Sequence, residues 1–398
     1  MSWSTVRADQ FCTLITDGTH DSPKPQQSGW KLITSKHLKG HYIDFDSANW
    51  ISEADYLKVI SRSAVEQWDI LFSMIGTIGN IYLEKNPHVE YACKNMGIFK
   101  FSGNKENALW MYYYLKSPQA KAYIQTHLRG STQAYVPLGG LREMPVPVPP
   151  QSVRNEIIAV LRPIDEKIEC NNAINDNLMQ QAVTIFKSWF VEYSPFDGIE
   201  PKEWETVNLE KITSLISRGI APKYSDNSDQ IVINQKCIRN HMIDLSQART
   251  HTPKVINEKW LRFGDLLINS TGDGTLGRAA QVWFQPQNIT VDSHVTVVRP
   301  AKENLIFYIG LWGVLHEREI ESLHTGSTGQ TELPKERVKA LELHLPDNGT
   351  LDRFNTLIAP MAAAIVSKQN ENKKLATLRD ALLPKLMSGE IDVSAVQL

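Results

Sequence analysis

Residues 151–191 read QSVRNEIIAVLRPIDEKIECNNAINDNLMQQAVTIFKSWFV, and residues 350–391 repeat the same pattern as TLDRFNTLIAPMAAAIVSKQNENKKLATLRDALLPKLMSGEI. A constant offset of 197 residues aligns the two stretches and places Pro163 on Pro360. Apolar residues in both recur three and four positions apart, which is typical of helices that pack along their length. We therefore expect two long helices of about 60 Å each, at ~1.5 Å per residue, with a kink or a restart at each proline.

The apolar positions of these helices define an expected packing seam that polar residues interrupt near the middle. The seam residues are Ile157, Leu161, Ile164, Ile168, Leu178, Ala182, Ile185 and Trp189 in the first helix, and Phe354, Ile358, Met361, Ile365, Leu375, Leu382 and Leu386 in the second. The interrupting residues are Asn171 and Asn175 in the first helix, and Lys368 and Asn372 in the second. If the helices are antiparallel, these residues meet in a buried polar layer, which costs stability but fixes register. Alternatively, the seam shifts to Ile174 and the asparagines face solvent.

Composition limits the class of protein. A chain of 398 residues with 42% hydrophobic residues is long enough for more than one packed domain. No apolar run approaches the roughly eighteen residues of a membrane span, and the opening MSWSTVRADQ lacks a signal-peptide core. The widely spaced Cys12, Cys93, Cys170 and Cys237 favour reduced thiols over disulfides or a metal site, so we expect a cytoplasmic protein. With a net charge of −2, a nucleic-acid partner would require local basic patches.

The chain is expected to run in the order domain, helix, domain, helix. The predicted parts are a globular domain in residues 1–150, a helical region in residues 151–193, a linker and second globular domain in residues 194–348, and a second helical region in residues 349–398. The two domains are themselves related, since DILFSMIGTIG at residues 69–79 matches DLLINSTGDGTLG at residues 265–277. The predicted fold class is α/β in the mixed α+β sense, with two globular domains separated by two long antiparallel coiled-coil helices. The duplication predicts a pseudo-twofold relation between the halves.

The motifs of common enzyme classes are missing from the sequence. Residues 272–277, GDGTLG, match the dinucleotide-binding pattern GxGxxG, but the following RAAQVWFQPQ favours a strand where that fingerprint requires a helix. A tight turn between strands is the better interpretation. The sequence contains no P-loop, GxSxG elbow, HExxH pair, Asn/Asp-Pro-Pro-Tyr/Phe methyltransferase stretch or PD…(D/E)xK nuclease pattern. We therefore expect no catalytic residues, no metal site and no cofactor on this chain.

Loops at corresponding places in the two domains carry side chains that can contact DNA. Arg, Lys, Asn and Gln read base edges, whereas Ser, Thr and Lys also bind phosphates. A solvated surface residue is the alternative interpretation for any single one, but the same loop positions are polar in both copies. The DNA-binding candidates are Thr19, His20, Lys24, Ser35, Lys36, Lys39, Lys94, Asn95, Arg129, Ser131, Thr132, Gln133 and Tyr135 in the first domain, and Arg218, Lys223, Tyr224, Gln235, Lys236, Arg239, Arg278, Ser293, His294, Ser327, Thr328 and Gln330 in the second.

The sequence resembles the specificity subunits of type I restriction-modification systems, the HsdS family. The resemblance rests on QAVTIFKSWFVE at residues 181–192, LATLRDALLPKLMSGEI at residues 375–391, the domain order and the Gly-Ser-Thr turns at residues 130–132 and 326–328. It implies two target recognition domains, each reading one half of a bipartite sequence in double-stranded DNA. It also implies that the helices dock two modification (methyltransferase) subunits, which carry S-adenosylmethionine and methylate adenine, and that restriction subunits join for cleavage. The first helix ends WFVEY where the second ends LMSGEI, so the two docking faces need not be equivalent.

Two other classes of function remain open on the sequence. One is a protein–protein scaffold that is built on the helices and does not bind DNA. The other is an enzyme with its own transferase site, for which no motif is found. The duplication also makes a prediction for a fragment of residues 1 to about 200, which holds one domain and one helix. We expect its helix to pair with that of a second copy in an antiparallel dimer, because the exposed seam has no other partner.

Overall fold

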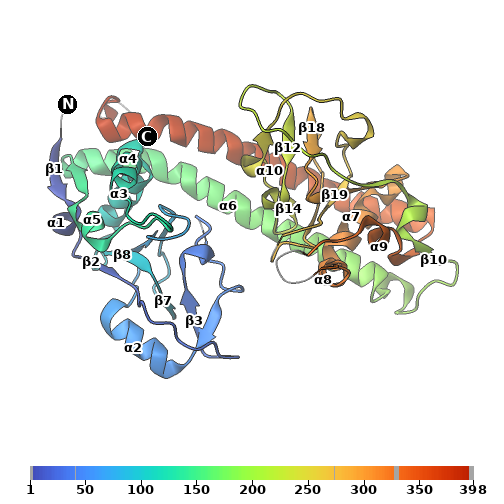
Figure 1. Cartoon of the computed structure of the whole chain (residues 1–398), viewed down its shortest axis with the longest axis horizontal. Coiled ribbons are helices and arrows are strands. Elements are labelled where there is room, and N and C mark those ends of the chain that lie inside the picture. Colours follow the sequence, from blue (N-terminus) through green and yellow to red (C-terminus); the bar gives the residue numbers. More distant parts are fainter. Residues whose placement is uncertain (1–2, 41, 273, 327–330, 394–398) are drawn as a thin grey trace. The chain divides into compact units, whose positions relative to one another are not determined.

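The computed structural model describes residues 3–40, 42–272, 274–326 and 331–393. The chain forms two compact units, one made of Met1–Glu169 with Lys373–Leu398 and the other of Cys170–Asn372. The boundary between the units crosses helices α6 (Gln151–Phe190) and α10 (Asn348–Ser388), which are green and red in Figure 1. Each unit therefore combines a globular domain with one segment of each long helix.

The globular domain of the first unit is a mixed α+β domain. Its strands are β1 (Ser4–Arg7), β2 (Leu14–Asp17), β3 (Trp30–Ile33), β4 (Asn49–Ile51), β5 (Ile70–Ser73), β6 (Ile81–Leu83), β7 (Tyr91–Cys93), β8 (Met96–Lys100) and β9 (Pro145–Val148), and its helices are α1 (Ala8–Phe11), α2 (Glu53–Ser63), α3 (Lys105–Lys116), α4 (Pro118–Thr126) and α5 (Leu138–Glu143). One sheet has the antiparallel order β2-β8-β5-β6. In a second sheet, β4-β3-β7, strands β3 and β7 are parallel. Strand β9 pairs with β1 and leads into α6.

The globular domain of the second unit repeats this plan. Its strands are β10 (Glu205–Asn208), β11 (Thr213–Arg218), β12 (Ile231–Ile233), β13 (Ile238–Arg239), β14 (Met242–Ile243), β15 (Arg249–Thr250), β16 (Leu266–Asn269), β17 (Ala279–Gln281), β18 (Ile289–Val291), β19 (Val295–Pro300) and β20 (Glu342–Leu345), and its helices are α7 (Ile306–Leu315), α8 (Glu317–Ser322) and α9 (Lys335–Lys339). The sheets β11-β19-β16-β17 and β15-β12-β18 correspond to β2-β8-β5-β6 and β4-β3-β7. The pair β10–β20 likewise corresponds to β1–β9. The matching sheet orders confirm the internal duplication, and β17 confirms that a strand follows the GDGTLG turn, of which Asp273 lies outside the described residues.

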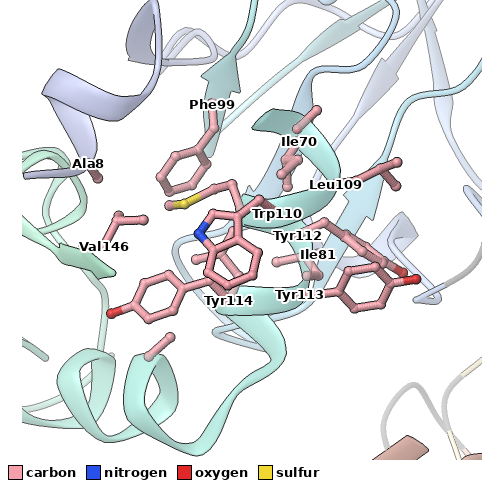
Figure 2. Packing of buried hydrophobic residues seen from close by; sticks show 14 of the residues in the cluster. Ala8, Ile70, Ile81, Phe99, Leu109, Trp110, Tyr112, Tyr113, Tyr114 and Val146 are labelled. Atoms are coloured by element: carbon pink, nitrogen blue, oxygen red, sulfur yellow. The ribbon is translucent and has the colours of Figure 1, made fainter. Parts of the chain in front are cut away.

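Helix α3 lies at the centre of the first domain's hydrophobic core. Residues 108–115 are all buried, so this helix lacks the exposed polar stripe of a surface helix. Figure 2 shows Trp110 and Tyr114 within this core. Trp110 Nε1 donates a hydrogen bond to Pro147 O at 2.8 Å, and Tyr114 Oη donates to Pro145 O. These bonds attach α3 to β9 and thereby position the first turn of α6.

Helices α6 and α10 pack against each other in both units, on positions that differ in part from the predicted seam. The buried residues are Ile157, Ile158, Leu161, Asp165, Asn171, Asn175, Met179, Ala182, Phe186 and Phe190 on α6, and Thr350, Leu351, Phe354, Ile358, Ala362, Ile365, Leu383, Leu386 and Met387 on α10. The predicted seam residues Ile164, Ile168, Leu178, Ile185, Trp189, Met361, Leu375 and Leu382 are only half-buried. From Asn171 to Phe190 the buried positions advance by four residues in all but one step. This advance of 19 residues takes five steps, an average of 3.8 residues per step, whereas the predicted three-and-four alternation averages about 3.5, so the buried face follows a longer period than predicted.

The asparagines in the middle of α6 are buried, so the alternative in which they face solvent is wrong. Asn171 and Asn175 are 0% and 2% exposed. Asn171 Nδ2 donates to Glu371 Oε2 and to Asn372 Oδ1, both at 2.9 Å, and Asn372 Nδ2 donates to Asn172 Oδ1 at 2.8 Å. The polar layer therefore joins the two helices by hydrogen bonds and fixes their register.

The helices run antiparallel, and neither restarts at its proline. In the second unit Asn171 contacts Asn372 and Phe190 contacts Phe354, so residue numbers rise along α6 as they fall along α10. Helix α6 continues through Pro163, and α10 continues through Pro360. Both prolines are exposed, so water can solvate the carbonyl that each leaves without an amide donor. Of the two predicted alternatives, the restart is therefore wrong, and the kink at each proline stays a prediction.

Each domain buries an ion pair next to the first residue of a central strand. Asp69 precedes β5 and lies 2.7 Å from Lys100 Nζ, and Asp265 precedes β16 and lies 2.7 Å from Arg299 Nη2. Both aspartates are 0% exposed. The two pairs occupy corresponding places, with arginine replacing lysine in the second domain. The duplication thus preserved a buried charge pair that no sequence motif marks.

We predict that Asp265→Ala lowers the free energy of unfolding by about 3–5 kcal/mol, because it leaves the buried Arg299 guanidinium without its carboxylate. The matched control is Glu205→Ala, which removes a carboxylate from the exposed pair with Lys211 and should change stability by less than about 0.5 kcal/mol. Equilibrium urea unfolding followed by tryptophan fluorescence measures both. Equal losses in the two variants would contradict the assignment of Asp265 to a buried pair on which the domain depends.

Candidate nucleic-acid interface

Parallel strand pairing brings several predicted loops of the first domain to one edge of a sheet. Strands β3 and β7 are parallel, with Ile33 beside Cys93, so the residues that follow both strands lie at the same edge. The segment after β3 supplies Ser35, Lys36 and Lys39, and the segment after β7 supplies Lys94 and Asn95. Lys94 N donates to Ile33 O at 2.8 Å, which ties the two segments together.

The loop that begins at Gly18 packs against the turn that follows β7. Thr19 N donates to Cys93 O at 2.9 Å, and Asn95 N donates to Thr19 O at 3.1 Å. Glycine is required at position 18 because a Cβ there would lie 2.3 Å from Cys93 O. This close approach places Thr19 and His20 at the same edge as Lys94 and Asn95.

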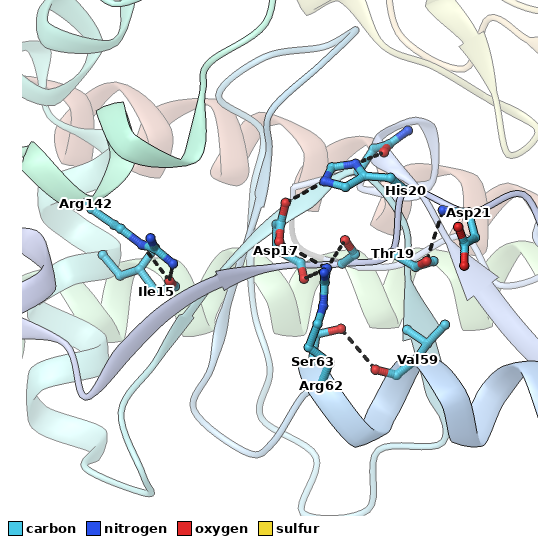
Figure 3. Close-up of polar contacts among 11 residues, drawn as sticks. Ile15, Asp17, Thr19, His20, Asp21, Val59, Arg62, Ser63 and Arg142 are labelled. Atoms are coloured by element: carbon cyan, nitrogen blue, oxygen red, sulfur yellow. Dashed lines mark hydrogen bonds and ion pairs between the residues drawn. The ribbon is translucent and has the colours of Figure 1, made fainter.

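A network of polar contacts holds the His20 side chain in place, as Figure 3 shows. One ring nitrogen of His20 lies 2.8 Å from Asp17 Oδ2, and the other lies 2.9 Å from Asn95 Oδ1. Arg62 of α2 donates from Nη2 to Asp17 Oδ1 at 3.2 Å and to Gly18 O at 3.0 Å. His20 is nevertheless largely exposed, with 67% of its side-chain surface accessible. The domain thus presents the hydrogen-bonding side chain of His20 in a fixed orientation. Binding would therefore cost little side-chain conformational entropy at this residue.

The short helix η1 (Ser35–His37) exposes Lys36 and buries the residues on either side. Lys36 is exposed, whereas Ser35 and His37 are 7% and 2% exposed. Thr34 N donates to His37 Nδ1 at 2.9 Å. Burial, together with the positive charge of Lys36, lowers the pKa of His37 to about 4, so His37 is neutral at pH 7. Ser35 therefore lies beneath the surface that Lys36 presents.

A hairpin between Arg129 and Tyr135 adds the remaining predicted residues of the first domain. Arg129 N donates to Tyr135 O at 2.8 Å, and Tyr135 N donates to Arg129 O at 2.9 Å. Val136 N donates to Met74 O at 2.9 Å, which joins the hairpin to the loop between β5 and β6. Ser131, Thr132 and Gln133 form the exposed tip.

The second domain has the same backbone frame. Strands β12 and β18 are parallel, and Asp292 N donates to Ile233 O at 2.9 Å, as Lys94 does to Ile33. Ile220 N donates to Val291 O at 2.9 Å, as Thr19 does to Cys93. Gly219 corresponds to Gly18, since a Cβ there would lie 2.0 Å from Val291 O. The loops that the sequence analysis placed at corresponding positions of the two domains are therefore equivalent in the structure.

Predicted residues of the second domain converge on Thr271, which no sequence pattern indicated. Thr271 Oγ1 donates to Gln235 Oε1 at 3.2 Å and lies 2.7 Å from His294 Nδ1. Arg218 forms an ion pair with Glu332 at 2.5 Å. Glu332 also forms an isolated antiparallel β-bridge with Thr271. Glu332 was also missed, although its place in the chain, shortly after a Gly-Ser-Thr turn, matches that of Tyr135.

The shared frame carries different side chains in the two domains. The differing pairs are Asp17 and Arg218, Lys94 and Asp292, and Tyr135 and Glu332. In the first two pairs the charge is reversed, and in the third an aromatic ring replaces a carboxylate. Lys36 and Lys236, by contrast, are identical and exposed in both domains.

Neither a metal-binding cluster nor a membrane-spanning helix is found in the part of the chain that the structure describes. Among residues 3–40, 42–272, 274–326 and 331–393, no cluster of three His, Cys, Asp or Glu side chains is placed to hold a metal ion. Over the same ranges, no helix has both the length and the apolar character needed to span a bilayer.

Comparison with known proteins identifies the family. The sequence model of the type I restriction modification DNA specificity domain matches residues 3–180 and again residues 201–359. The chain belongs to this family. It is accordingly the non-catalytic component that gives a type I restriction-modification system its DNA sequence specificity. DNA and the other subunits of such a system are its partners.

Relatives match this specificity subunit over nearly its whole length. The MjaIX specificity subunit of Methanocaldococcus jannaschii is 26% identical over 390 residues, covering 91% of this chain and 86% of the relative. The HindI specificity subunit of Haemophilus influenzae is 20% identical over 416 residues, covering 86% and 90%. A crystal structure of a type I S subunit from M. genitalium superposes with a TM-score of 0.54 at 13% identity, covering 97% of this chain and 96% of that one, and so shares its fold.

The remaining predicted contact residues of this specificity subunit make other contacts or lie outside the described residues. Lys24 lines a hollow of about 390 Å³ with Asp21, Asp55 and Lys58. Tyr224 stacks under Arg249, whose guanidinium carbon lies 3.5 Å from the ring centroid, and Lys223 O accepts from Thr252 N. Arg239 folds back on Lys236 O, and Arg278 on Gly274 O. Ser293 is half-buried beside His294, and Lys39 Nζ donates to Lys36 O. Ser327, Thr328 and Gln330 lie outside the described residues.

We predict that acid destabilises the protein through His37. Its folded pKa of about 4 is below its unfolded value near 6.5, so the unfolded state binds more protons as pH falls through this window. Between pH 7 and pH 5 this term should remove about 2 kcal/mol of unfolding free energy. His37→Cys copies Cys237, which is buried in the corresponding helix η4 (Gln235–Cys237), and should flatten this part of the profile. A wild-type and a variant profile of the same slope would contradict the prediction.

Proposed function

We propose that this specificity subunit reads a bipartite sequence in double-stranded DNA, with residues 1–150 reading one half-site and residues 194–348 the other. Helices α6 and α10 dock two modification subunits, which bind S-adenosylmethionine and methylate adenine, and restriction subunits join the complex for cleavage. The complex works in the cytoplasm. This chain contributes the sequence specificity.

The observation that carries the proposal is the shared frame with differing side chains. Base edges are read by hydrogen bonds of defined donor and acceptor pattern, so a different base sequence requires different side chains. Asp17 directly precedes Gly18, and Arg218 directly precedes Gly219. The carboxylate of Asp17 pairs with Arg62, whereas the guanidinium of Arg218 pairs with Glu332, so the corresponding positions differ in charge and in donor and acceptor character. Two domains of equal backbone geometry therefore support two unlike half-sites.

The identical Lys36 and Lys236 fit the part of the contact that does not depend on sequence. Both lysines are exposed and lie in corresponding short helices, η1 and η4. Contacts to phosphate position a protein on the duplex and carry no direct sequence information. A residue that is unchanged between two readers of different half-sites suits that role.

Exposed apolar residues on the helices suit docking of other subunits. In the second unit α10 leaves Leu357 44% exposed, and in the first unit it leaves Leu378 49% exposed. Val191, directly after α6, is 46% exposed. Each unit thus presents an apolar helical side chain of its own, in keeping with one modification subunit for each unit.

We predict that Lys36→Ala and Lys236→Ala each weaken DNA binding to a similar degree on every sequence. Loss of one phosphate contact should make the slope of log affinity against log salt shallower by about one. The measurement is a salt titration of binding by the subunit with its modification partner, and Lys121→Ala on the exposed face of α4 is the control. A loss of about 1–3 kcal/mol in discrimination at one base pair would instead identify a base contact.

Exchange of a single domain tests the proposed function most simply. Residues 205–348 are replaced by the corresponding segment of a relative with a different target, and methylated adenines are mapped with the partner present. We predict that only one half of the recognised sequence changes. The reciprocal exchange of residues 4–148 should change only the other half. A change in both halves on either exchange would contradict the assignment of one half-site to each domain.

A further inference from the structure

A buried ion pair joins α6 to α10 in the first unit. Arg379 Nη1 lies 2.8 Å from Asp165 Oδ1, and Lys116 Nζ of α3 lies 3.1 Å from Asp165 Oδ2. Asp165 is 8% exposed, and the Arg379 side chain is 20% exposed. Burial acts to raise the pKa of Asp165, but Lys116 and Arg379 together hold it below its usual value. The carboxylate is therefore ionised at neutral pH and depends on cations from two other helices.

The duplicated position in the second unit carries no charge. The offset of 197 residues maps Asp165 onto Ala362 and Arg379 onto Ala182. Ala362 and Ala182 are 2% and 0% exposed and belong to one hydrophobic cluster. The same layer of the helix pair is thus an ion pair in one unit and a pair of alanines in the other. At these matched positions α6 has the aspartate but an alanine in place of the arginine. Helix α10 has the arginine, which also pairs with its neighbour Asp380 at 2.8 Å, but an alanine in place of Asp165.

This asymmetry affects which helices can pair. Because the seam is duplicated, α6 could also lie antiparallel to α6 of a second copy. That arrangement would place each Asp165 opposite an Ala182, and two copies of α10 would place each Arg379 opposite an Ala362. Each like pair would therefore bury two charges without their partner on the facing helix, which is unfavourable. The antiparallel dimer expected of a fragment of residues 1 to about 200 would carry this cost.

The contact between asparagines in the mid-helix polar layer makes this distinction only weakly. Asn171 faces Asn372 in the second unit, and the residue of α6 that corresponds to Asn372 is Asn175. An asparagine would therefore face Asn171 in the native pair and in a pair of α6 helices. A pair of α6 helices would lose only the hydrogen bond from Asn171 to Glu371, because Glu371 corresponds to Ile174 of α6.

We propose that the Asp165–Arg379 pair determines which long helices pair with each other. It favours pairing of α6 with α10 and disfavours association of two copies of this chain through α6–α6 or α10–α10 contacts. The buried charges act chiefly by destabilising α6–α6 and α10–α10 pairs. Apolar contacts do not select in this way, because they would have the same shape in the native pair and in the like pairs. This inference rests on the helices alone and does not depend on how the domains read DNA.

The test moves the arginine from α10 to α6 in the full-length chain. In Ala182→Arg/Arg379→Ala, native pairing would bury Asp165 opposite the introduced alanine and would bury the introduced arginine opposite Ala362. Pairing of α6 with α6 of a second copy would satisfy both charges twice, while the two α10 helices would meet through alanines only. The matched control, Ala182→Arg/Ala362→Asp, carries the same new arginine but supplies its partner within the chain.

Light scattering after size-exclusion chromatography measures the outcome. We expect the mass of one chain for the wild type and for the control, and the mass of two chains for Ala182→Arg/Arg379→Ala. A folded single chain for that variant, or a dimer for the control as well, would overturn the proposal.

A second measurement tests the proposal even if the relocated arginine prevents folding. Urea midpoints are compared for Asp165→Ala, Arg379→Ala and the double variant. The double variant should lose less than the sum of the two single losses, because each single change leaves one buried charge without its partner on the other helix. Strictly additive losses would show that the two charges are not coupled and would also overturn the proposal.

Discussion

The pairing of α6 with α10 is the constraint on which the rest of the structure depends, because neither globular domain completes its hydrophobic core without both helices. In the first unit the core that contains Trp110 and Tyr113 continues through Leu161 of α6 to Leu386 of α10. In the second unit the core around Tyr308 continues through Phe186 of α6 to Phe354 of α10. Segments that are about two hundred residues apart in the chain must therefore meet before either domain is finished. Such distant contacts carry a high loop-closure cost, which only the burial of a large apolar surface can offset.

Much of this arrangement could be predicted from the sequence because duplication leaves a signal of its own. The constant offset between the two long stretches identified the helices, and separate matches between the two globular domains identified the repeated domain and the equivalence of loops such as those that hold Lys36 and Lys236. The packed face of the helices was predicted less well. Apolar spacing favoured Ile164, Ile168 and Leu178, whereas the structure buries Asp165, Met179 and Phe186. A charged side chain in a seam has no apolar signature, and its place becomes visible only when its partner on the other helix is known.

The candidate interface shows a similar limit. The sequence indicated which loops are polar, and parallel pairing of β3 with β7 and of β12 with β18 explains why several of them share an edge. It did not indicate that Ser35 is buried, that Tyr224 stacks under Arg249, or that Glu332 pairs with Arg218. These features depend on contacts between residues far apart in the chain. Composition and local pattern therefore locate a surface, whereas the side chains that can act together are defined only by the fold.

The central claim is that one chain presents two readers of unlike chemistry on a common frame, and the recognised sequence itself tests it most directly. Methylated adenines can be mapped by sequencing DNA from cells that express this chain with its modification subunit. The account predicts an interrupted sequence with two different halves separated by a gap of fixed length, because corresponding positions of the two domains carry opposite charges. A continuous target, or an interrupted palindrome with two identical half-sites, would contradict it.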